Sequence, residues 1–98
     1  MEVHFATNVL QRCYEDSSKA VQAWGLVVAR KYIQRIEILY AAKQFEDLHR
    51  IRSLRLHRLA GPRGAQYAVS LHDRWRLILM KEGDDGVEVK EVTNHYGD

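Results

Sequence analysis

The hydrophobic pattern of this sequence changes its period near Leu54, and that change constrains the fold more than any other feature. Before this point, apolar residues recur every three or four positions, which is typical of helices that bury one face. After it, apolar and polar residues alternate, which is typical of strands in a sheet. Helices followed by strands predict an α+β fold, with the helices packed on one face of a mostly antiparallel sheet of about four to five strands.

The first half of the chain predicts one short strand and then helices. Residues 2–6 form the strand, and Thr7 or Asn8 caps a helix that ends near Glu15. Two serines then begin an amphipathic helix of about 24 residues. Its predicted core positions follow helical spacing: Val21, Trp24, Val28, Tyr32, Ile36 and Leu39. Residues 45–51 add one or two further helical turns.

The second half predicts the rest of the sheet. The strand at 75–80 is apolar at nearly every position, so we expect it to be central and buried on both faces. His72–Asp73 and residues 83–86 are short and polar, as turns between antiparallel strands require. The predicted strands are residues 54–57, 67–71, 75–80 and 87–92.

Length and composition favour a single domain spanning residues 1–98. The chain has 98 residues and is 46% hydrophobic, which is enough for one core and too little for two. Its single cysteine, Cys13, has no partner for an internal disulfide, and the first residues do not resemble a signal peptide. No apolar run is long enough to cross a bilayer. We therefore expect a soluble, cytoplasmic protein.

The positive charge is concentrated in one segment. The segment from Arg50 to Arg76 holds seven arginines and one acid, Asp73, a balance of +6, so the rest of the chain carries −4 of the net +2. Such a polarised surface favours a polyanionic partner, and arginine matches phosphate better than lysine does. The alternative is that these arginines only solvate one face of the sheet. They are Arg50, Arg52, Arg55, Arg58, Arg63, Arg74 and Arg76.

Residues 56–77 contain a recognisable motif. It consists of Leu56-His57, then Gly61-Pro62-Arg63, an alternating strand, and Trp75-Arg76-Leu77. In these pieces and their spacing, the chain resembles the RelE/HigB toxins of bacterial type II toxin-antitoxin systems. The order of the predicted elements and the chain length agree with that family as well. The resemblance implies a RelE-like fold and an endoribonuclease that cuts messenger RNA in the ribosomal A site, without metal or cofactor. It also implies a helix-turn-helix antitoxin partner, similar to HigA.

The same resemblance assigns roles in RNA cleavage. In this family the 2′-hydroxyl of the RNA attacks the adjacent phosphodiester, so one group must accept a proton and another must donate one. His57 and His95 are the predicted pair, since imidazole titrates near pH ~6.5. Arg76 would stabilise charge on the phosphate. The predicted substrate-binding residues are Arg55, Arg58, Arg63, Arg74, Asn94 and Tyr96.

Two departures from the family pattern keep other functions open. Ala60 stands where the family has lysine, and Asn94-His95-Tyr96 replaces its terminal Asp-Tyr-His. One alternative is a ParE-like toxin that inhibits DNA gyrase without cleaving RNA. The other is a catalytically weak member that only binds RNA or its antitoxin. For His57 and His95 themselves, the alternatives are a hydrogen-bonded strand residue and a surface residue near the chain end.

The remaining histidines give no sign of a metal site. His4, His49 and His72 are not spaced as ligands with Cys13 or with each other. We interpret them as surface or structural residues and predict no metal and no cofactor.

Overall fold

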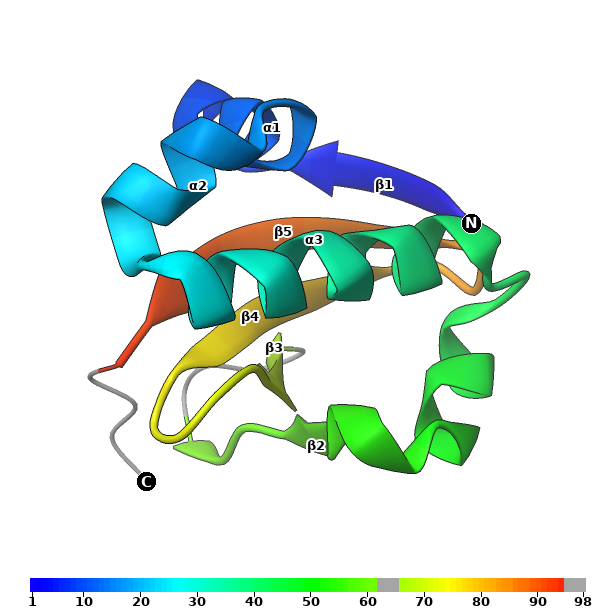
Figure 1. Cartoon of the computed structure of the whole chain (residues 1–98). Helices are drawn as coiled ribbons and strands as arrows, with labels where there is room; N and C mark the ends of the chain where they lie inside the picture. Colours follow the sequence, from blue (N-terminus) through cyan, green and yellow to red (C-terminus); the bar gives the residue numbers. More distant parts are fainter. Residues whose placement is uncertain (62–65, 95–98) are drawn as a thin grey trace.

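The computed structural model describes residues 1–61 and 66–94 of the chain. Within these residues, three α-helices and two 3₁₀-helices pack with a five-stranded sheet, which confirms the α+β fold (Figure 1). The elements are β1 (Glu2–Phe5), α1 (Asn8–Glu15), α2 (Ser17–Trp24), α3 (Leu26–Ala41), η1 (Phe45–Arg50), η2 (Arg52–Leu54), β2 (His57–Arg58), β3 (Gln66–Ser70), β4 (Arg76–Glu82) and β5 (Gly86–Thr93). None of the described helices is long and apolar enough to span a membrane.

The sheet has the order β1-β5-β4-β3-β2. Strands β2 to β5 pair antiparallel with their neighbours, whereas β1 runs parallel to β5, with Val3 beside Val87. The first and last strands along the chain are therefore neighbours in space. The mostly antiparallel sheet agrees with the prediction.

The sheet buries its helical face most deeply. Leu77 and Leu79 of β4 are fully buried in the main core, together with Tyr32 and Ile36 of α3. Ile78, which points to the opposite face, is buried in a second, smaller cluster with Leu59 and Ala68. Burial of three successive residues confirms that β4 is a central strand covered on both faces.

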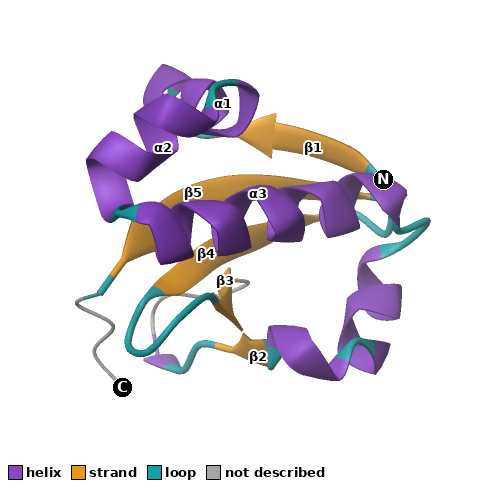
Figure 2. Cartoon of the chain, in the orientation of Figure 1, coloured by secondary structure: helices purple, strands orange, loops and turns teal. Residues whose placement is uncertain are grey.

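The long helix predicted after residue 17 is wrong in two respects: Gly25 divides it into α2 and α3, and Val21, a predicted core position, is exposed. Gly25 has φ 83° and ψ 167°, a conformation that only glycine adopts without strain. The chain turns there, so that α2 lies beside α1 and α3 crosses the sheet (Figure 2). Tyr32 and Trp24 still meet across the turn, with ring centroids 4.7 Å apart and edge-on. Both are packing residues, as predicted.

The strand predicted at residues 54–57 is also shorter than expected. Leu54 belongs to the 3₁₀-helix η2 and is buried, and Arg55 has a left-handed backbone with φ 48°. Pairing with β3 begins only at His57, opposite Ala68. The apolar-polar alternation of these residues therefore comes from a turn that buries one leucine.

Hydrogen bonds fix both ends of the helical layer. The Thr7 hydroxyl caps α1 by accepting from the Leu10 amide at 3.2 Å, as predicted. At the other end, the Met1 amino group donates to the carbonyl oxygens of Leu39, Tyr40 and Ala42, where α3 stops. These carbonyls would otherwise lack partners. The start of β1 is thereby held against the end of α3.

Candidate functional site

The turn between β3 and β4 is the centre of the candidate site. It closes with a hydrogen bond from the Trp75 amide to the His72 carbonyl oxygen at 2.9 Å. Asp73 takes a left-handed conformation there, with φ 51°, which aspartate tolerates better than most residues. The turn separates two surface cavities, and His72 and Asp73 line both of them.

The first cavity lies between this turn, α3 and η2 and has a volume of about 400 Å³. Arg55 and Arg76, which are far apart in the sequence, both line it. Lys31 and Arg35 of α3 line it as well. The structure thus brings two predicted site residues together and adds two cations that the sequence interpretation did not include. We call it the cationic cavity.

The second cavity is wider, about 680 Å³, and lies where the turn meets the end of β5. Arg74, Trp75 and Asn94 line it. Arg74 and Asn94 were both predicted to bind substrate, and here they share one surface with a partly exposed indole. Such a combination offers a cation, an amide and an aromatic ring to a ligand.

Arg76 is partly exposed at the start of β4. Its guanidinium Nη1 donates to the carbonyl oxygens of Asp73 at 2.6 Å and Trp75 at 2.9 Å. These bonds draw the guanidinium back over the β3–β4 turn and fix its position. Arg76 is therefore a positioned cation at the edge of the cationic cavity.

His57 is exposed on β2 and is oriented by its own chain. Its Nδ1 lies 3.2 Å from the carbonyl oxygen of Arg55. A carbonyl oxygen only accepts, so Nδ1 carries the proton, and in the neutral ring Nε2 holds the lone pair. This tautomer suits the proton-accepting role that the sequence predicted for His57.

The sheet register places His57 and Arg76 on one face. His57 is opposite Ala68, which is opposite Ile78, and Arg76 lies two residues before Ile78. Two strand spacings and two residues along a strand put their Cα atoms about 12 Å apart. The second, smaller apolar cluster, which consists of Leu59, Ala68 and Ile78, lies between the two positions.

The sequence analysis predicted that His57 and His95 act together. The strands that lead to them, β2 and β5, are not adjacent in the sheet. β3 and β4 lie between β2 and β5, and Glu91 of β5 is in the same row as His57, about 14 Å away by strand spacing. His95 itself lies outside the described residues, as do Arg63 and Tyr96. Their roles remain predictions. Arg58 is described, is exposed on β2, and lines neither cavity.

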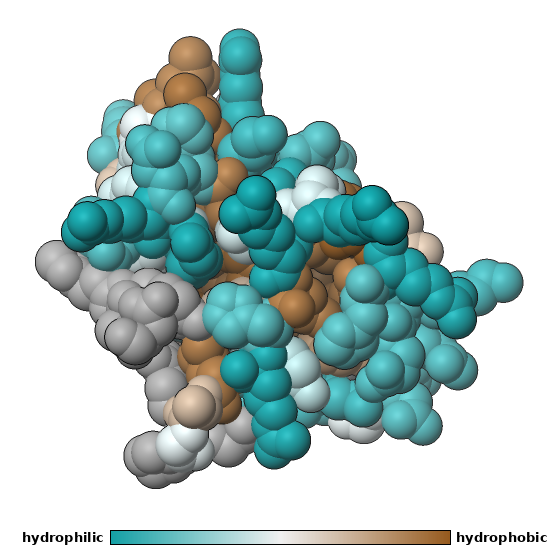
Figure 3. Space-filling view, turned by 90° about the horizontal axis from the view of Figure 1, so that it is seen from below, coloured by the Kyte–Doolittle hydropathy of each residue, from teal (hydrophilic) through white to brown (hydrophobic). Residues whose placement is uncertain are grey.

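Seen from the side of β2 and η2, hydrophilic side chains cover most of the surface, and hydrophobic surface shows between them (Figure 3). This is the side expected from the arginine-rich segment. Lys31 and Arg35, in contrast, come from α3. Arg35 lies three residues after Tyr32 and four before Leu39, both of which are buried, so it belongs to the buried face of α3. This spacing could have predicted from the sequence that Arg35 is buried.

Comparisons with known proteins add no family assignment. No model of a known protein family matches the sequence, and no curated protein shows significant similarity to it.

Proposed function

We propose that this protein is a toxin of the RelE/HigB type that cleaves messenger RNA on the ribosome and is restrained by a helix-turn-helix antitoxin. The motif in residues 56–77 and the α+β fold support the proposal. The cytoplasm, where ribosomes are found, is its proposed location.

One observation carries the proposal. His57, with its proton on Nδ1, is hydrogen-bonded to the same residue, Arg55, that lines the cationic cavity with Arg76. His57 does not line the cavity itself, but it is two residues from Arg55, and the cations of the cavity suit a phosphate. General-base removal of a proton next to a fixed positive charge is what cleavage by a 2′-hydroxyl requires.

The proposed reaction is an internal transfer at phosphorus. Nε2 of His57 accepts the proton of the 2′-hydroxyl as the 2′-oxygen forms a bond to phosphorus. The bond from phosphorus to the 5′-oxygen breaks, and His95 donates a proton to that oxygen. The products are a 2′,3′-cyclic phosphate and a free 5′-hydroxyl. Arg76 offsets the negative charge that builds on the phosphate in between.

Substrate binding would depend on the arginines around the two cavities. Arg55 and Arg74 present exposed guanidinium groups on either side of the β3–β4 turn, and Asn94 adds an amide. Contacts of this kind to ribosome-bound RNA are largely electrostatic and weaken with salt. The antitoxin would cover this side of the molecule or pack against the helices.

The experiment is controlled expression in a bacterial host, with mapping of new 5′ ends in messenger RNA. We expect His57→Ala, Arg76→Ala and His95→Ala each to relieve growth arrest. Loss of one proton-transfer group should slow cleavage by about 10²–10⁴. His49→Ala and Arg50→Ala are matched controls, because both are exposed outside the two cavities, and both should stay toxic.

Three outcomes would contradict the proposal. If all three site variants remain fully toxic, the assigned residues are wrong. DNA damage without new RNA ends would indicate a gyrase inhibitor of the ParE type. An unmodified protein that binds its antitoxin but neither cuts RNA nor arrests growth would be a member that only binds.

A further inference from the structure

We propose that the cationic cavity binds a phosphomonoester, such as the terminal phosphate of a nucleotide, through Lys31 and Arg35 of α3. This inference does not depend on RNA cleavage, because it concerns how the cavity binds an anion. It assigns a ligand-binding role to two residues of a helix that otherwise serves the core.

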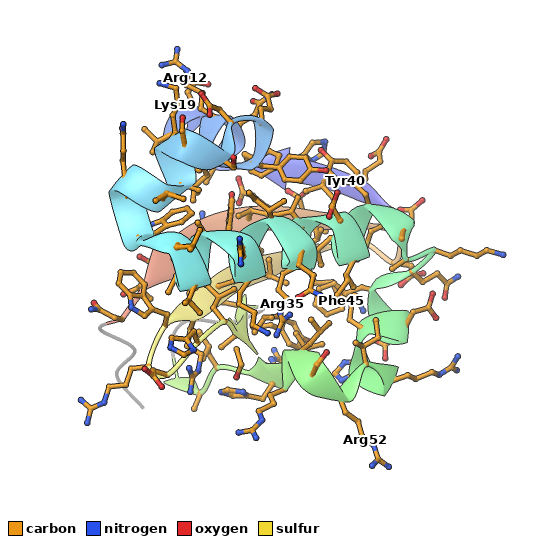
Figure 4. The ribbon with its side chains drawn as sticks, viewed as in Figure 1. Arg12, Lys19, Arg35, Tyr40, Phe45 and Arg52 are labelled. Carbon is orange, nitrogen blue, oxygen red and sulfur yellow. The ribbon has the colours of Figure 1, made fainter. Side chains whose placement is uncertain are left out.

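Arg35 is the central observation. Its side chain extends from α3 toward η2 and β2 (Figure 4), and the residue is only 5% exposed. The guanidinium donates to three neutral oxygens: the Ser70 carbonyl at 3.2 Å, the Ser53 carbonyl at 3.3 Å and the Gln34 side chain at 2.7 Å. Among the described residues, no carboxylate pairs with it. A buried charge held only by neutral acceptors is costly, and an anion would compensate it.

Arg35 also has donors to spare. A guanidinium carries five N–H groups, and the three hydrogen bonds use three of them. Two N–H groups therefore have no acceptor within residues 1–61 and 66–94, although the residue lines the cavity. The fixed, planar arrangement of these donors matches two oxygens of a phosphate.

The other cations of the cavity strengthen the case. Lys31 and Arg55 have no ion-pair partner in the part of the chain that the structure describes. Among the described residues, Asp73 is the one acid that lines the cavity, and its carboxylate is 80% exposed and lies 3.2 Å from His72. With Arg35 and Arg76, four cations face one solvated acid, a local balance of +3.

This balance selects the type of phosphate. A phosphodiester carries one negative charge, whereas a phosphomonoester carries about −1.5 to −2 at neutral pH and has three terminal oxygens. The doubly charged group neutralises more of the positive charge of the cavity and offers its cations three terminal oxygens, one more than a phosphodiester has. The volume of about 400 Å³ leaves room for the phosphate and part of the group attached to it.

The test is titration calorimetry of the full chain at pH about 7.5 and fixed ionic strength. The probes are inorganic phosphate, adenosine monophosphate, a dinucleoside phosphodiester and adenosine. We expect phosphate and adenosine monophosphate to bind, the phosphodiester to bind at least about tenfold more weakly, and adenosine not to bind. Comparing inorganic phosphate with adenosine monophosphate shows which ligand the cavity prefers. Adenosine monophosphate binds more tightly than phosphate only if the protein also contacts the nucleoside.

Lys31→Gln is the main variant, because Lys31 is partly exposed and outside the core. This substitution should weaken the binding of adenosine monophosphate by about tenfold, which is the loss expected when one hydrogen bond to a charged group is removed. Arg30→Gln is the matched control: it removes the same charge from the neighbouring position of α3, which does not line the cavity. The Arg30→Gln variant should bind adenosine monophosphate with the affinity of the unmodified protein.

Arg35→Lys keeps the charge and loses the planar fork, so it should bind more weakly while circular dichroism confirms the fold. Equal losses in Lys31→Gln and Arg30→Gln would overturn the proposal, because they would reflect net charge only. So would a phosphodiester that binds as tightly as the monoester, or no binding of either phosphate. The expression experiment tests RNA cleavage separately by new 5′ ends, so failure of phosphomonoester binding and failure of cleavage can be distinguished.

Discussion

Replacing Gly25 with alanine tests how the helical layer is built. In a continuous helix, such as the sequence pattern suggests, alanine would stabilise the protein by about 1 kcal/mol, because glycine is a poor helix former. In the structure, Gly25 has φ 83° and ψ 167°, where a side chain is strained by about 1–3 kcal/mol. The two arrangements thus predict opposite signs for one substitution.

The magnitude follows from the backbone alone. Apart from Gly25 itself and its two chain neighbours, no atom lies within 4 Å of a Cβ placed on Gly25, so the cost of alanine comes from the local backbone. Alanine also restricts the unfolded chain, which offsets about 0.4–1 kcal/mol of the strain. We therefore expect Gly25→Ala to lower the free energy of unfolding by about 1 kcal/mol, within a range of roughly 0–2.6 kcal/mol. In a domain of this size, a loss of about 1 kcal/mol corresponds to a fall in Tm of roughly 4–8 °C.

The assay is urea unfolding followed by circular dichroism, with the midpoint and the slope fitted separately. Ala23→Gly, at an exposed position of α2, serves as a control and should cost up to about 1 kcal/mol through helix propensity in either arrangement. A rise in the midpoint for Gly25→Ala would mean that α2 and α3 form one continuous helix, and it would refute the break at Gly25.

Two further substitutions test single contacts. Tyr32→Phe should lower the free energy of unfolding by about 1 kcal/mol, because the buried hydroxyl donates to the Leu10 carbonyl oxygen at 2.7 Å; an unchanged urea midpoint would refute this. The Glu82 carboxylate, 2.8 Å from His4 Nδ1, accepts a hydrogen bond and raises the pKa of His4 above about 6.5. This stabilisation is present below that pH and lost as the pH rises through the raised pKa, so His4→Ala should be more destabilising at pH about 6 than at pH about 8.5.

Much of the fold follows from sequence pattern, and its errors have a common physical cause. Periodicity indicates which residues face the core, but not whether the helix that carries them is continuous. Trp24 and Tyr32 pack together across Gly25, so the apolar spacing persists through the break. The glycine itself was the only local sign of it. Likewise, Leu54 is buried from a 3₁₀ turn, which four residues of alternation cannot distinguish from a strand.

The candidate site was less predictable, because it depends on pairings between distant segments. The cluster of arginines in one segment pointed to Arg55 and Arg76, and these do line a common cavity. Arg35 was hidden because charged residues on helices are usually exposed. Only the tertiary packing of α3 against η2 and the end of β3 buries it, with carbonyl oxygens of Ser53 and Ser70 as acceptors.

The parallel pairing of β1 with β5 has a consequence for synthesis of the chain. Residues 2–5 leave the ribosome long before the strand they bind, residues 86–93, has been made. Until then Val3 and Phe5 have no sheet edge to join, and β4 lacks one of its two neighbours. Contacts this distant in sequence form late and slowly. A nascent chain that stops before residue 86 therefore cannot complete the sheet, and the protein should reach its working form only after residue 93 has left the ribosome.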